Sequence, residues 1–444
     1  MNLQQKLNYQ IHPGGKLSGS LRVPGDKSIS HRSIMLGSLA DGRTLVKGFL
    51  EGEDSLATLN AFRQMGVKIE GPESGRVTIQ GVGIDGLHAP QNPLDLGNSG
   101  TSMRLLTGLL AGQGLAVTLT GDSSLSARPM KRVIDPLSRM GADIGSAAEY
   151  TAPLRIHPRS NLQGIDYTLP MASAQVKSAI LLAGLFAKGE TCVIEPAPTR
   201  DHTERMLQGF GYPVTRRDNR ICLTGGGRLN GCEIDIPADI SSATFFLVGA
   251  AIAEGSEMVL QHVGINPTRD GVISILRLMG ADIELSRERV VGGEPVADIR
   301  IRSSRLNGVD IPQELVPLAI DEFPAIFVAA ACAQGETRLR GAEELRVKES
   351  DRIQVMAEGL QGLGIQADAT PDGILIQGGT LQGGRVNSYG DHRIAMSFAM
   401  AGLRAADPIE IVDCANVNTS FPGFVSAATA AGLRIQEVTN QWPG

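Results

Sequence analysis

The sequence predicts an α/β protein made of six similar units, divided between two domains of three units each. With 444 residues, the chain is longer than one hydrophobic core usually supports. A pattern that ends helices also recurs along it: an apolar residue and a glycine close a helical stretch, and a short alternating, strand-like run follows. The glycines of this pattern are Gly66, Gly141, Gly211, Gly280, Gly364 and Gly432.

A second series of helices interleaves with the first. Each of its members is rich in small residues and leads through a turn into a β-rich run, such as AVTLTG or IEIVDC. These helices are expected to begin near Ser30, Thr101, Ser173, Ser241, Glu322 and Arg393. Each unit therefore reads helix, strand, helix, strand, with further strands between, and parallel strands need crossover connections. An ordinary doubly wound α/β fold is the alternative.

The composition describes an ordinary soluble globular protein, with 42% hydrophobic and 20% charged residues. A net charge of -6 opposes a broad nucleic-acid or membrane-surface footprint, so anions would be bound by local clusters of cations. The N-terminus lacks the apolar core of a signal peptide, and the longest apolar stretches are too short to span a bilayer. We therefore expect a cytoplasmic protein.

The cysteines are odd in number and scattered, without the spacing of a metal site. We expect them to be reduced and mostly buried, as in a cytosolic protein, and we expect no metal. They are Cys192, Cys222, Cys232, Cys332 and Cys414.

Polar motifs that could bind anions occur at the expected helix starts of the N-terminal half. In the segment 24–32, Lys27, Ser28 and Arg32 offer donors where the backbone N–H groups of a helix already favour anions. The spacing is not that of a Walker A loop, and a solvated helix start is the alternative. The other motifs of this half contribute Asn98, Gly100, Thr101, Arg104, Arg128, Ser173, Gln175 and Arg200. Helix capping, by Thr101 for example, or a charged first turn is the alternative for these.

The C-terminal half adds acids to the cations. Asp321 lies between apolar residues, which would suit a general base, although a helix N-cap is the alternative. Lys348, Glu349 and Arg352 form one charged turn, which exposed ion pairing would also explain. With Arg393, the cations at helix starts come from both halves of the chain, which indicates a cleft that closes on a small, multiply charged anion.

Five of these segments, GDKSISHR, LGNSGTSMRLL, ARPM, RVKESDR and DHRIAM, resemble the 3-phosphoshikimate 1-carboxyvinyltransferase (EPSP synthase) family in their order. The resemblance covers nearly the whole chain, and the segments SAQVK, RDHTE and NPTR are similar to its class II branch. It implies a two-domain inside-out α/β barrel of six βαβαββ repeats. Residues 24–238 would form an inserted domain, residues 1–23 and 239–444 a discontinuous domain, and the active site would lie in the cleft between them.

The resemblance also implies the reaction and its residues. The enolpyruvyl group of phosphoenolpyruvate would move to the 5-hydroxyl of shikimate 3-phosphate, releasing phosphate, in the shikimate pathway to chorismate and aromatic amino acids, without a cofactor. The implied catalytic residues are Asp321, Glu349 and Lys27. Phosphoenolpyruvate would be bound by Lys27, Asn98, Gly100, Thr101, Arg128, Gln175, Arg352 and Arg393. Shikimate 3-phosphate would be bound by Lys27, Ser28, Arg32, Ser173, Ala174, Gln175, Arg200, Asp321 and Lys348.

Two positions depart from patterns found in the family. The segment 418–422 lacks a lysine that members of the other class often carry, which puts a C-terminal lysine contact to phosphoenolpyruvate in doubt. Gly100 stands where the best-known glyphosate-tolerant class II enzymes have alanine. Since glycine leaves space for an inhibitor longer than phosphoenolpyruvate, we expect glyphosate to inhibit this enzyme, and we expect a monomer.

Three other functions are less consistent with the sequence. The UDP-N-acetylglucosamine carboxyvinyltransferase shares the fold, but the segment 121–126 lacks the reactive cysteine of that enzyme. Nucleic-acid end processing is opposed by the acidic balance and the lack of basic, aromatic-interleaved stretches. A non-catalytic anion-binding module would not require Asp321 and Glu349 among the cations.

Overall fold

The chain divides into two compact units in a computed structural model that describes residues 6–158 and 161–440. The inserted unit comprises Gly25–Pro237 with Val290–Glu294. The discontinuous unit comprises the described residues up to Pro24, Ala238–Arg289, and those from Pro295 onward. At both crossings the division falls one residue from the expected boundary. Residues 290–294 group with the inserted unit because Arg205 donates to Gly293 O at 2.8 Å.

The inserted unit contains three four-stranded sheets in its described part. Its strands are β3 (Asp41–Lys47), β4 (Lys68–Glu73), β5 (Arg76–Val82), β6 (Leu94–Asp95), β7 (Val117–Thr120), β8 (Asp143–Gly145), β9 (Leu154–His157), β10 (Asp166–Thr168), β11 (Glu190–Ile194), β12 (Thr215–Arg217), β13 (Arg220–Thr224) and β14 (Glu233–Asp235). Its helices are α1 (Lys27–Leu39), α2 (Glu53–Gln64), α3 (Gly100–Ala111), α4 (Ser123–Ser126), α5 (Lys131–Arg139), α6 (Ala174–Gly184) and α7 (His202–Gly209). The strand orders are β14-β3-β5-β4, β6-β7-β9-β8 and β10-β11-β13-β12.

The discontinuous unit repeats this arrangement. Its strands are β1 (Lys6–Ile11), β2 (Ser18–Leu21), β15 (Glu257–Gly264), β16 (Asp282–Val291), β17 (Glu294–Arg302), β18 (Glu336–Leu339), β19 (Gln366–Thr370), β20 (Gly373–Gln377), β21 (Gly384–Asn387), β22 (Ile409–Val412) and β23 (Ile435–Asn440). Its helices are α8 (Ile240–Ile252), α9 (Gly271–Leu278), α10 (Phe323–Ala331), α11 (Arg352–Gly362), α12 (His392–Ala401) and α13 (Phe424–Ala431). The strand orders are β16-β17-β15-β2, β18-β20-β19 and β21-β22-β1-β23.

The sixfold repeat predicted from the sequence is confirmed, and the described residues form six sheets, five of four strands and one of three. In one repeat the chain runs β6, α3, β7, α5, β8, β9; β6 pairs in parallel with β7, and β9 lies antiparallel between β7 and β8. Strands distant in sequence complete a sheet in each unit, since β14 pairs with β3 and β1 lies between β22 and β23. Helices of one repeat series end at the predicted glycines, which adopt the left-handed conformation with φ between 81° and 117°.

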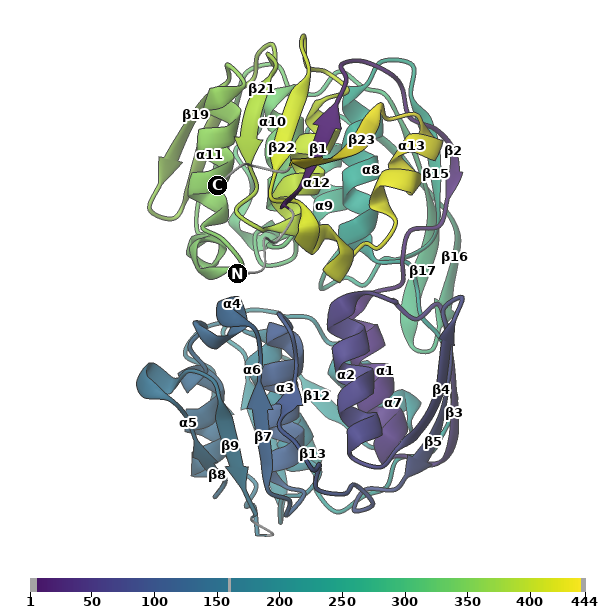
Figure 1. The fold of residues 1–444 in the computed structure, drawn as a ribbon, viewed down its shortest axis with the longest axis vertical. Helices are drawn as coiled ribbons and strands as arrows, with labels where there is room; N and C mark the ends of the chain where they lie inside the picture. Colours follow the sequence, from purple (N-terminus) through teal and green to yellow (C-terminus); the bar gives the residue numbers. More distant parts are fainter. Residues whose placement is uncertain (1–5, 159–160, 441–444) are drawn as a thin grey trace. The chain divides into compact units, whose positions relative to one another are not determined.

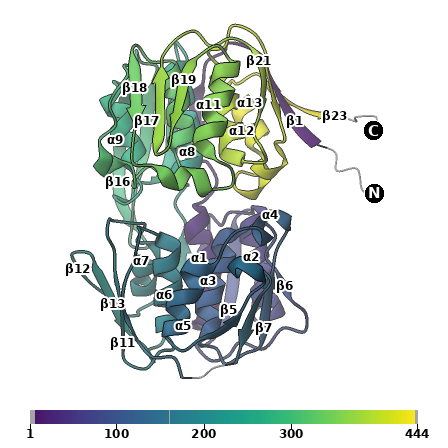
Figure 2. The ribbon, with the colours of Figure 1, turned by 90° about the vertical axis from the view of Figure 1, so that its left-hand side faces the viewer.

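Helices fill the interior of each unit, as the inside-out fold requires. Every residue of α8, α10 and α12 is buried, which is why these helices are rich in small and apolar residues all around. In the inserted unit, α1 and α3 lie between the sheet of β3, β4 and β5 and the sheet of β7, β8 and β9 (Figure 1). In the discontinuous unit, α8 and α12 lie between the β18 and β19 side and the strands β1 and β23 (Figure 2). The alternative, an ordinary doubly wound α/β fold, is therefore wrong.

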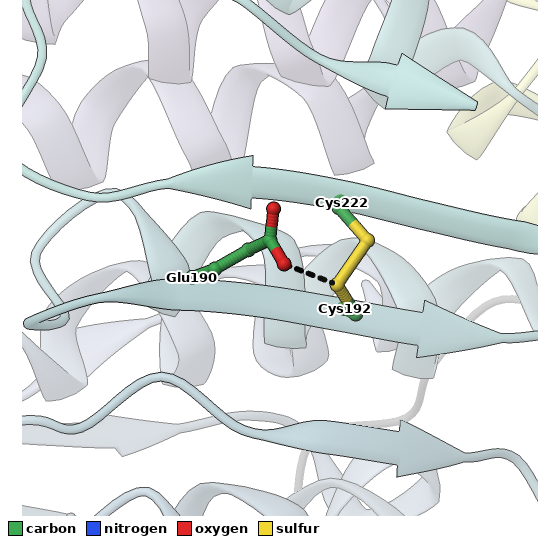
Figure 3. A group of neighbouring side chains, drawn as sticks. All are labelled: Glu190, Cys192 and Cys222. Atoms are coloured by element: carbon green, nitrogen blue, oxygen red, sulfur yellow. Dashed lines mark hydrogen bonds between the residues drawn. A yellow bond between two sulfur atoms is a disulfide. The ribbon is translucent and has the colours of Figure 1, made fainter. Parts of the chain in front are cut away.

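Two cysteines differ from the expectation that all are reduced. Cys192 and Cys222 lie opposite each other on the antiparallel strands β11 and β13 and form a disulfide, with Cα atoms 4.2 Å apart (Figure 3). Glu190 Oε2 lies 3.4 Å from Cys192 Sγ. Scattered spacing in sequence gave no sign of this pair, because strand register brings the two residues together. Cys232, Cys332 and Cys414 are free thiols.

None of the helices in the described residues combines the length and the apolar character needed to cross a membrane.

Candidate functional site

The polar residues singled out from the sequence gather where the interior helices begin, because short polar side chains cap these helices. Asp26 caps α1 by accepting from Ile29 N at 2.9 Å, and Ser99 caps α3 by accepting from Ser102 N at 3.1 Å. The same role falls to Ser173 for α6, Asp239 for α8, Asp351 for α11 and Asp391 for α12. Backbone N–H groups at such helix starts favour anions, so the fold places several anion-binding helix ends in each unit.

In the inserted unit, one cluster is organised around two arginines at the start of α3 and before α5. Arg128 Nη2 donates to Asn98 Oδ1 at 2.6 Å, and Asn98 in turn donates to Asp122 at 2.7 Å. Arg104 Nη1 donates to Gln175 Oε1 at 2.9 Å. The two guanidinium groups approach Gly100 so closely that a Cβ there would lie 2.8 Å from one and 3.0 Å from the other.

Gln175 links this cluster to α3 through Thr101. Its Nε2 donates to Thr101 Oγ1 at 3.1 Å, while its Oε1 accepts from Arg104. The expectation that Thr101 caps α3 is wrong, because Ser99 is the cap and Thr101 lies in the first turn. The sequence placed both hydroxyls near the helix start, and only the backbone geometry distinguishes them.

Lys27 opens α1 and is paired with an acid that the sequence had not indicated. Its Nζ lies 3.1 Å from Asp54 Oδ2 on α2, and both side chains are mostly buried. Beneath it, His31 is completely buried and bonds to Thr58 at 2.8 Å, which continues to Ser102 at 2.6 Å. Burial, reinforced by nearby cations, holds the pKa of His31 well below its ordinary value, so this ring is neutral.

A second cluster of the inserted unit surrounds Arg32. Its Nε donates to Thr203 Oγ1 at 2.7 Å and its Nη2 to Ser178 Oγ at 2.8 Å, and Nη1 donates to the carbonyl of Ser28 at 2.9 Å. Burial, and to a smaller extent the positive charge of Arg200, lower the pKa of Arg32 to about 10, although the carboxylates of Glu204 and Asp26 oppose this shift. An arginine buried among hydroxyls, with a second arginine near it, is an arrangement suited to a doubly charged phosphate.

Ser173 and Ala174 lie at the start of α6, directly before Gln175 in sequence. Ser173 Oγ accepts from Val176 N at 3.4 Å, and Ala174 is the first residue of the helix. Both are half-buried. Their positions agree with a binding role through the helix end, although the cap already uses the Ser173 hydroxyl.

In the discontinuous unit, three carboxylates converge on Arg352, whose side chain is 1% exposed. Its Nε donates to Asp391 at 2.8 Å, its Nη2 to Glu349 at 2.7 Å and its Nη1 to Asp321 at 3.2 Å. Burial alone would lower the pKa of Arg352, but these carboxylates raise it above its ordinary value. In return, Arg352 holds the pKa of Asp391 below its ordinary value in spite of burial. Arg352 therefore stays charged at any physiological pH.

The remaining predicted residues of this unit adjoin Asp321. Lys348 Nζ lies 3.6 Å from Asp321 Oδ1 and 2.5 Å from Glu344. Arg393 Nη1 donates to the Asp321 carbonyl at 3.0 Å and lies 3.8 Å from Glu322. Glu322, and not Asp321, is the N-cap residue of α10, so the capping alternative for Asp321 is wrong.

The structure also brings together charged residues to which the sequence reasoning gave no role. They are Asp54 near Lys27, Glu322 and Arg269 near Arg393, and the group of Lys177, Glu195 and Glu204. Glu322, Lys177 and Glu204 lie next to a predicted residue in sequence or one helical turn after one. A charged residue inside an otherwise apolar helix, as in AQVKSAILL, was the available signal for Lys177.

Two groups of side chains in the described residues have the geometry of metal ligands. Glu190, Cys192 and Cys222 form one, but its sulfur atoms are joined as a disulfide. In the other, His202 Nδ1 bonds to Glu294 at 2.7 Å, and Asp201 is paired with Arg205 at 2.8 Å. An arginine in the second group supplies the positive charge that a metal would supply, so neither group fits a cation.

Comparisons with known proteins agree over the full length. The family model described as EPSP synthase (3-phosphoshikimate 1-carboxyvinyltransferase) matches residues 11–427. The 3-phosphoshikimate 1-carboxyvinyltransferase of Alkalilimnicola ehrlichii is 69% identical over 430 residues, which cover 97% of this chain and 96% of that protein. The enzyme of the same name from Nitrosococcus oceani is 67% identical, with 98% of each chain covered. A solved structure of EPSP synthase from Acinetobacter baumannii superposes with a TM-score of 0.90 at 58% identity, covering 98% of this chain and 100% of that one.

Proposed function

The chain belongs to the EPSP synthase (3-phosphoshikimate 1-carboxyvinyltransferase) family, and we propose on this premise how its residues carry out the reaction. The enzyme transfers the enolpyruvyl group of phosphoenolpyruvate to the 5-hydroxyl of shikimate 3-phosphate. The products are 5-enolpyruvylshikimate 3-phosphate and phosphate. The reaction belongs to the shikimate pathway, which supplies the aromatic amino acids.

The observation that carries the assignment of roles is the convergence of Asp321 and Glu349 on Arg352. The two carboxylates contact different nitrogens of one buried guanidinium, at 3.2 Å and 2.7 Å. Transfer needs two proton movements, one from the attacking hydroxyl and one to the methylene carbon of phosphoenolpyruvate. A pair of acids fixed by one permanent cation provides a base and an acid whose separation is set by the protein.

In the first step, the 5-hydroxyl loses its proton to Asp321 as its oxygen attacks carbon 2 of phosphoenolpyruvate. The methylene carbon gains a proton from Glu349 or from Lys27, which gives a tetrahedral adduct. In the second step, the methyl group loses a proton and the carbon–oxygen bond to phosphate breaks, which restores the double bond. Charge that develops on the phosphate and carboxylate is stabilised by the arginines.

Phosphoenolpyruvate is bound, in this proposal, by the cluster around Gly100 and by the arginines of the discontinuous unit. Arg128, held by Asn98, and Gln175, held by Arg104, offer fixed donors. The complete set is Lys27, Asn98, Gly100, Thr101, Arg128, Gln175, Arg352 and Arg393. Three arginines and a lysine match the charge of a phosphate and a carboxylate on one small molecule.

Shikimate 3-phosphate is bound, in this proposal, by the cluster around Arg32. Arg32 and Arg200 face its phosphate, and the hydroxyls of Thr203 and Ser178 keep the Arg32 guanidinium in place. Asp321 and Lys348 act on the hydroxyls of its ring. The complete set is Lys27, Ser28, Arg32, Ser173, Ala174, Gln175, Arg200, Asp321 and Lys348.

Several of these cations contact protein carboxylates, so anion binding exchanges one negative partner for another. Lys27 has Asp54 at 3.1 Å, Lys348 has Glu344 at 2.5 Å, and Arg352 has Glu349 at 2.7 Å. When phosphoenolpyruvate takes the place of Glu349 on Arg352, the Glu349 carboxylate loses its cationic partner, which favours the protonated form that can donate to the methylene carbon. Substrate binding would thereby prepare the proton donor.

The choice of acceptor tests this function against the rival transferase. Phosphorus NMR of the protein with phosphoenolpyruvate and shikimate 3-phosphate should show inorganic phosphate and a new monophosphate ester in equal amounts. UDP-N-acetylglucosamine in place of shikimate 3-phosphate should give neither. Turnover with UDP-N-acetylglucosamine but not with shikimate 3-phosphate would assign the chain to the UDP-N-acetylglucosamine carboxyvinyltransferase reaction. Tight binding of shikimate 3-phosphate without turnover would favour a non-catalytic anion-binding module.

We propose in addition a monomeric, cytoplasmic enzyme that glyphosate inhibits. The support for inhibition is Gly100, which leaves the space beside Arg104 and Arg128 without a methyl group. The support for the location is the sequence, with its net charge of -6 and no apolar stretch of membrane length.

A further inference from the structure

A completely buried lysine of the inserted unit has no part in the proposed binding of either substrate. Lys177 lies on α6 and none of its side chain is exposed. Its Nζ forms an ion pair with the equally buried Glu195 and another with Glu204 at 2.7 Å. Arg216 completes the group, 3.6 Å from Glu195. Two cations and two acids balance, so the cluster is neutral as a whole.

The cluster hydrogen-bonds to the backbone and the side chain of one loop residue, Thr199. Glu195 Oε1 accepts from Thr199 Oγ1 at 2.6 Å, and Glu195 Oε2 lies 3.4 Å from Thr199 N. Lys177 Nζ donates to the carbonyl oxygen of Thr199 at 3.4 Å. The same buried ion pair therefore binds the backbone N–H, the carbonyl oxygen and the hydroxyl of Thr199.

Thr199 directly precedes Arg200, and Lys177 lies one helical turn after Ser173. The backbone N–H of Lys177 donates to the carbonyl oxygen of Ser173 at 3.1 Å. The loop 196–201 leads from β11 into α7, whose Thr203 bonds to Arg32 at 2.7 Å. The ion pair thus joins two segments that carry proposed ligands of shikimate 3-phosphate: the start of α6 and the residue next to Arg200.

Burial of the ion pair is a poor source of stability, because the loss of hydration offsets most of the attraction between the charges. Apolar residues of similar volume would fill the space with less loss of hydration. An ion pair contributes directional hydrogen bonds instead, and through these the lysine and the glutamate hold the loop in one conformation. The loop itself is open to solvent at Pro196 and Pro198.

We propose that Lys177, Glu195 and Thr199 are positioning residues that hold Arg200 in place for the phosphate of the acceptor substrate. The inference rests on the proposed function, since it assigns Arg200 to shikimate 3-phosphate. None of the three residues touches the substrate. They set where the guanidinium of Arg200 lies before the phosphate arrives, and so they contribute to acceptor affinity and not to the proton transfers.

The test uses Thr199→Val, which has nearly the same shape and removes the hydroxyl bond to Glu195, and Thr199→Ser, which keeps it. Thr199→Val should raise the KM for shikimate 3-phosphate and its dissociation constant by roughly 5- to 20-fold, since the precise placement of one charged contact is lost. The kcat and the KM for phosphoenolpyruvate should stay within about twofold of wild type. Thr199→Ser should restore the acceptor KM.

A matched control is Thr151→Val, which removes a side-chain bond of 2.7 Å to Ala148 O in the same unit. It should leave both KM values unchanged. An unchanged acceptor KM in Thr199→Val would overturn the inference. So would equal increases in both KM values together with a lower Tm, because that pattern marks a general loss of structure. Absence of any turnover by the wild-type protein would instead overturn the proposed function, whatever the variants do.

Discussion

Substitution of Gly100 by alanine gives a direct test of how the phosphoenolpyruvate cluster is packed. Gly100 is the first residue of α3 and does not need a left-handed backbone conformation, so alanine fits the helix there. The added Cβ would lie 2.8 Å from Arg104 Nη1 and 3.0 Å from Arg128 Nη1, whereas ordinary contacts begin at 3.4 Å. The two guanidinium groups must therefore retreat by the differences, 0.6 Å (3.4 minus 2.8) and 0.4 Å (3.4 minus 3.0).

These movements disturb the bonds that orient the cluster. Arg128 is held by Asn98 at 2.6 Å and Arg104 by Gln175 at 2.9 Å, and shifts of this size weaken both. Losing part of one charge-assisted hydrogen bond costs about 1 kcal/mol, which is a roughly fivefold rise in the KM for phosphoenolpyruvate. Glyphosate is longer than phosphoenolpyruvate and would also meet the methyl group, so its inhibition constant should rise by at least about tenfold more than the KM.

The assay is phosphate release at saturating shikimate 3-phosphate, with phosphoenolpyruvate varied at several glyphosate concentrations. Gly362→Ala is the control, because a Cβ at this helical position would meet nothing within 4 Å; its constants should match wild type. Equal inhibition constants for wild type and Gly100→Ala would refute the steric reasoning, even if the KM changed.

Three further predictions concern single side chains. Arg128→Ala should weaken phosphoenolpyruvate binding by about 1.5–3 kcal/mol, or roughly 10- to 150-fold, and leave shikimate 3-phosphate binding intact. Calorimetric titration with each substrate measures both affinities, and an unchanged affinity for phosphoenolpyruvate would remove Arg128 from the site. Glu349→Gln should mainly lower kcat, and a large loss of acceptor affinity at normal turnover would contradict its role as proton donor. Burial holds the pKa of His31 below its ordinary value, so at low pH this histidine binds a proton in the unfolded chain but not in the folded chain. The free energy of unfolding is therefore highest above about pH 6.5 and falls as the pH is lowered. His31→Gln should flatten the fall in the free energy of unfolding between pH 7 and pH 5, obtained from urea titrations, by up to about 1.4 kcal/mol per pH unit. Parallel curves for wild type and His31→Gln would show that protonation of this ring does not contribute.

The repeat architecture could be predicted from the sequence because each repeat carries its own local signals. The six glycines that end helices need a left-handed backbone, and polar caps such as Asp26 and Ser99 mark where the interior helices begin. Local signals also explain the errors at single residues. Ser99 and Thr101 are equally good caps by composition, and only the path of the chain makes Ser99 the cap.

Partners that depend on tertiary packing were beyond the reach of sequence patterns. Nothing near Lys27 in sequence indicates Asp54, which comes from the following helix, and the bond between Cys192 and Cys222 depends on the register of two strands. Lys177 was visible as a charge in an apolar helix, but its two acids lie on other elements. Helix starts and glycines are encoded locally, whereas the pairing of buried charges is set by the whole fold.

The central claim is that the residues gathered at these helix starts transfer an enolpyruvyl group between two specific substrates. Phosphate release, measured with shikimate 3-phosphate and phosphoenolpyruvate together and with each omitted in turn, tests it most directly. We expect release only when both substrates are present, in step with loss of phosphoenolpyruvate. Release that needs no acceptor, or none at all from protein shown to be folded, would contradict it.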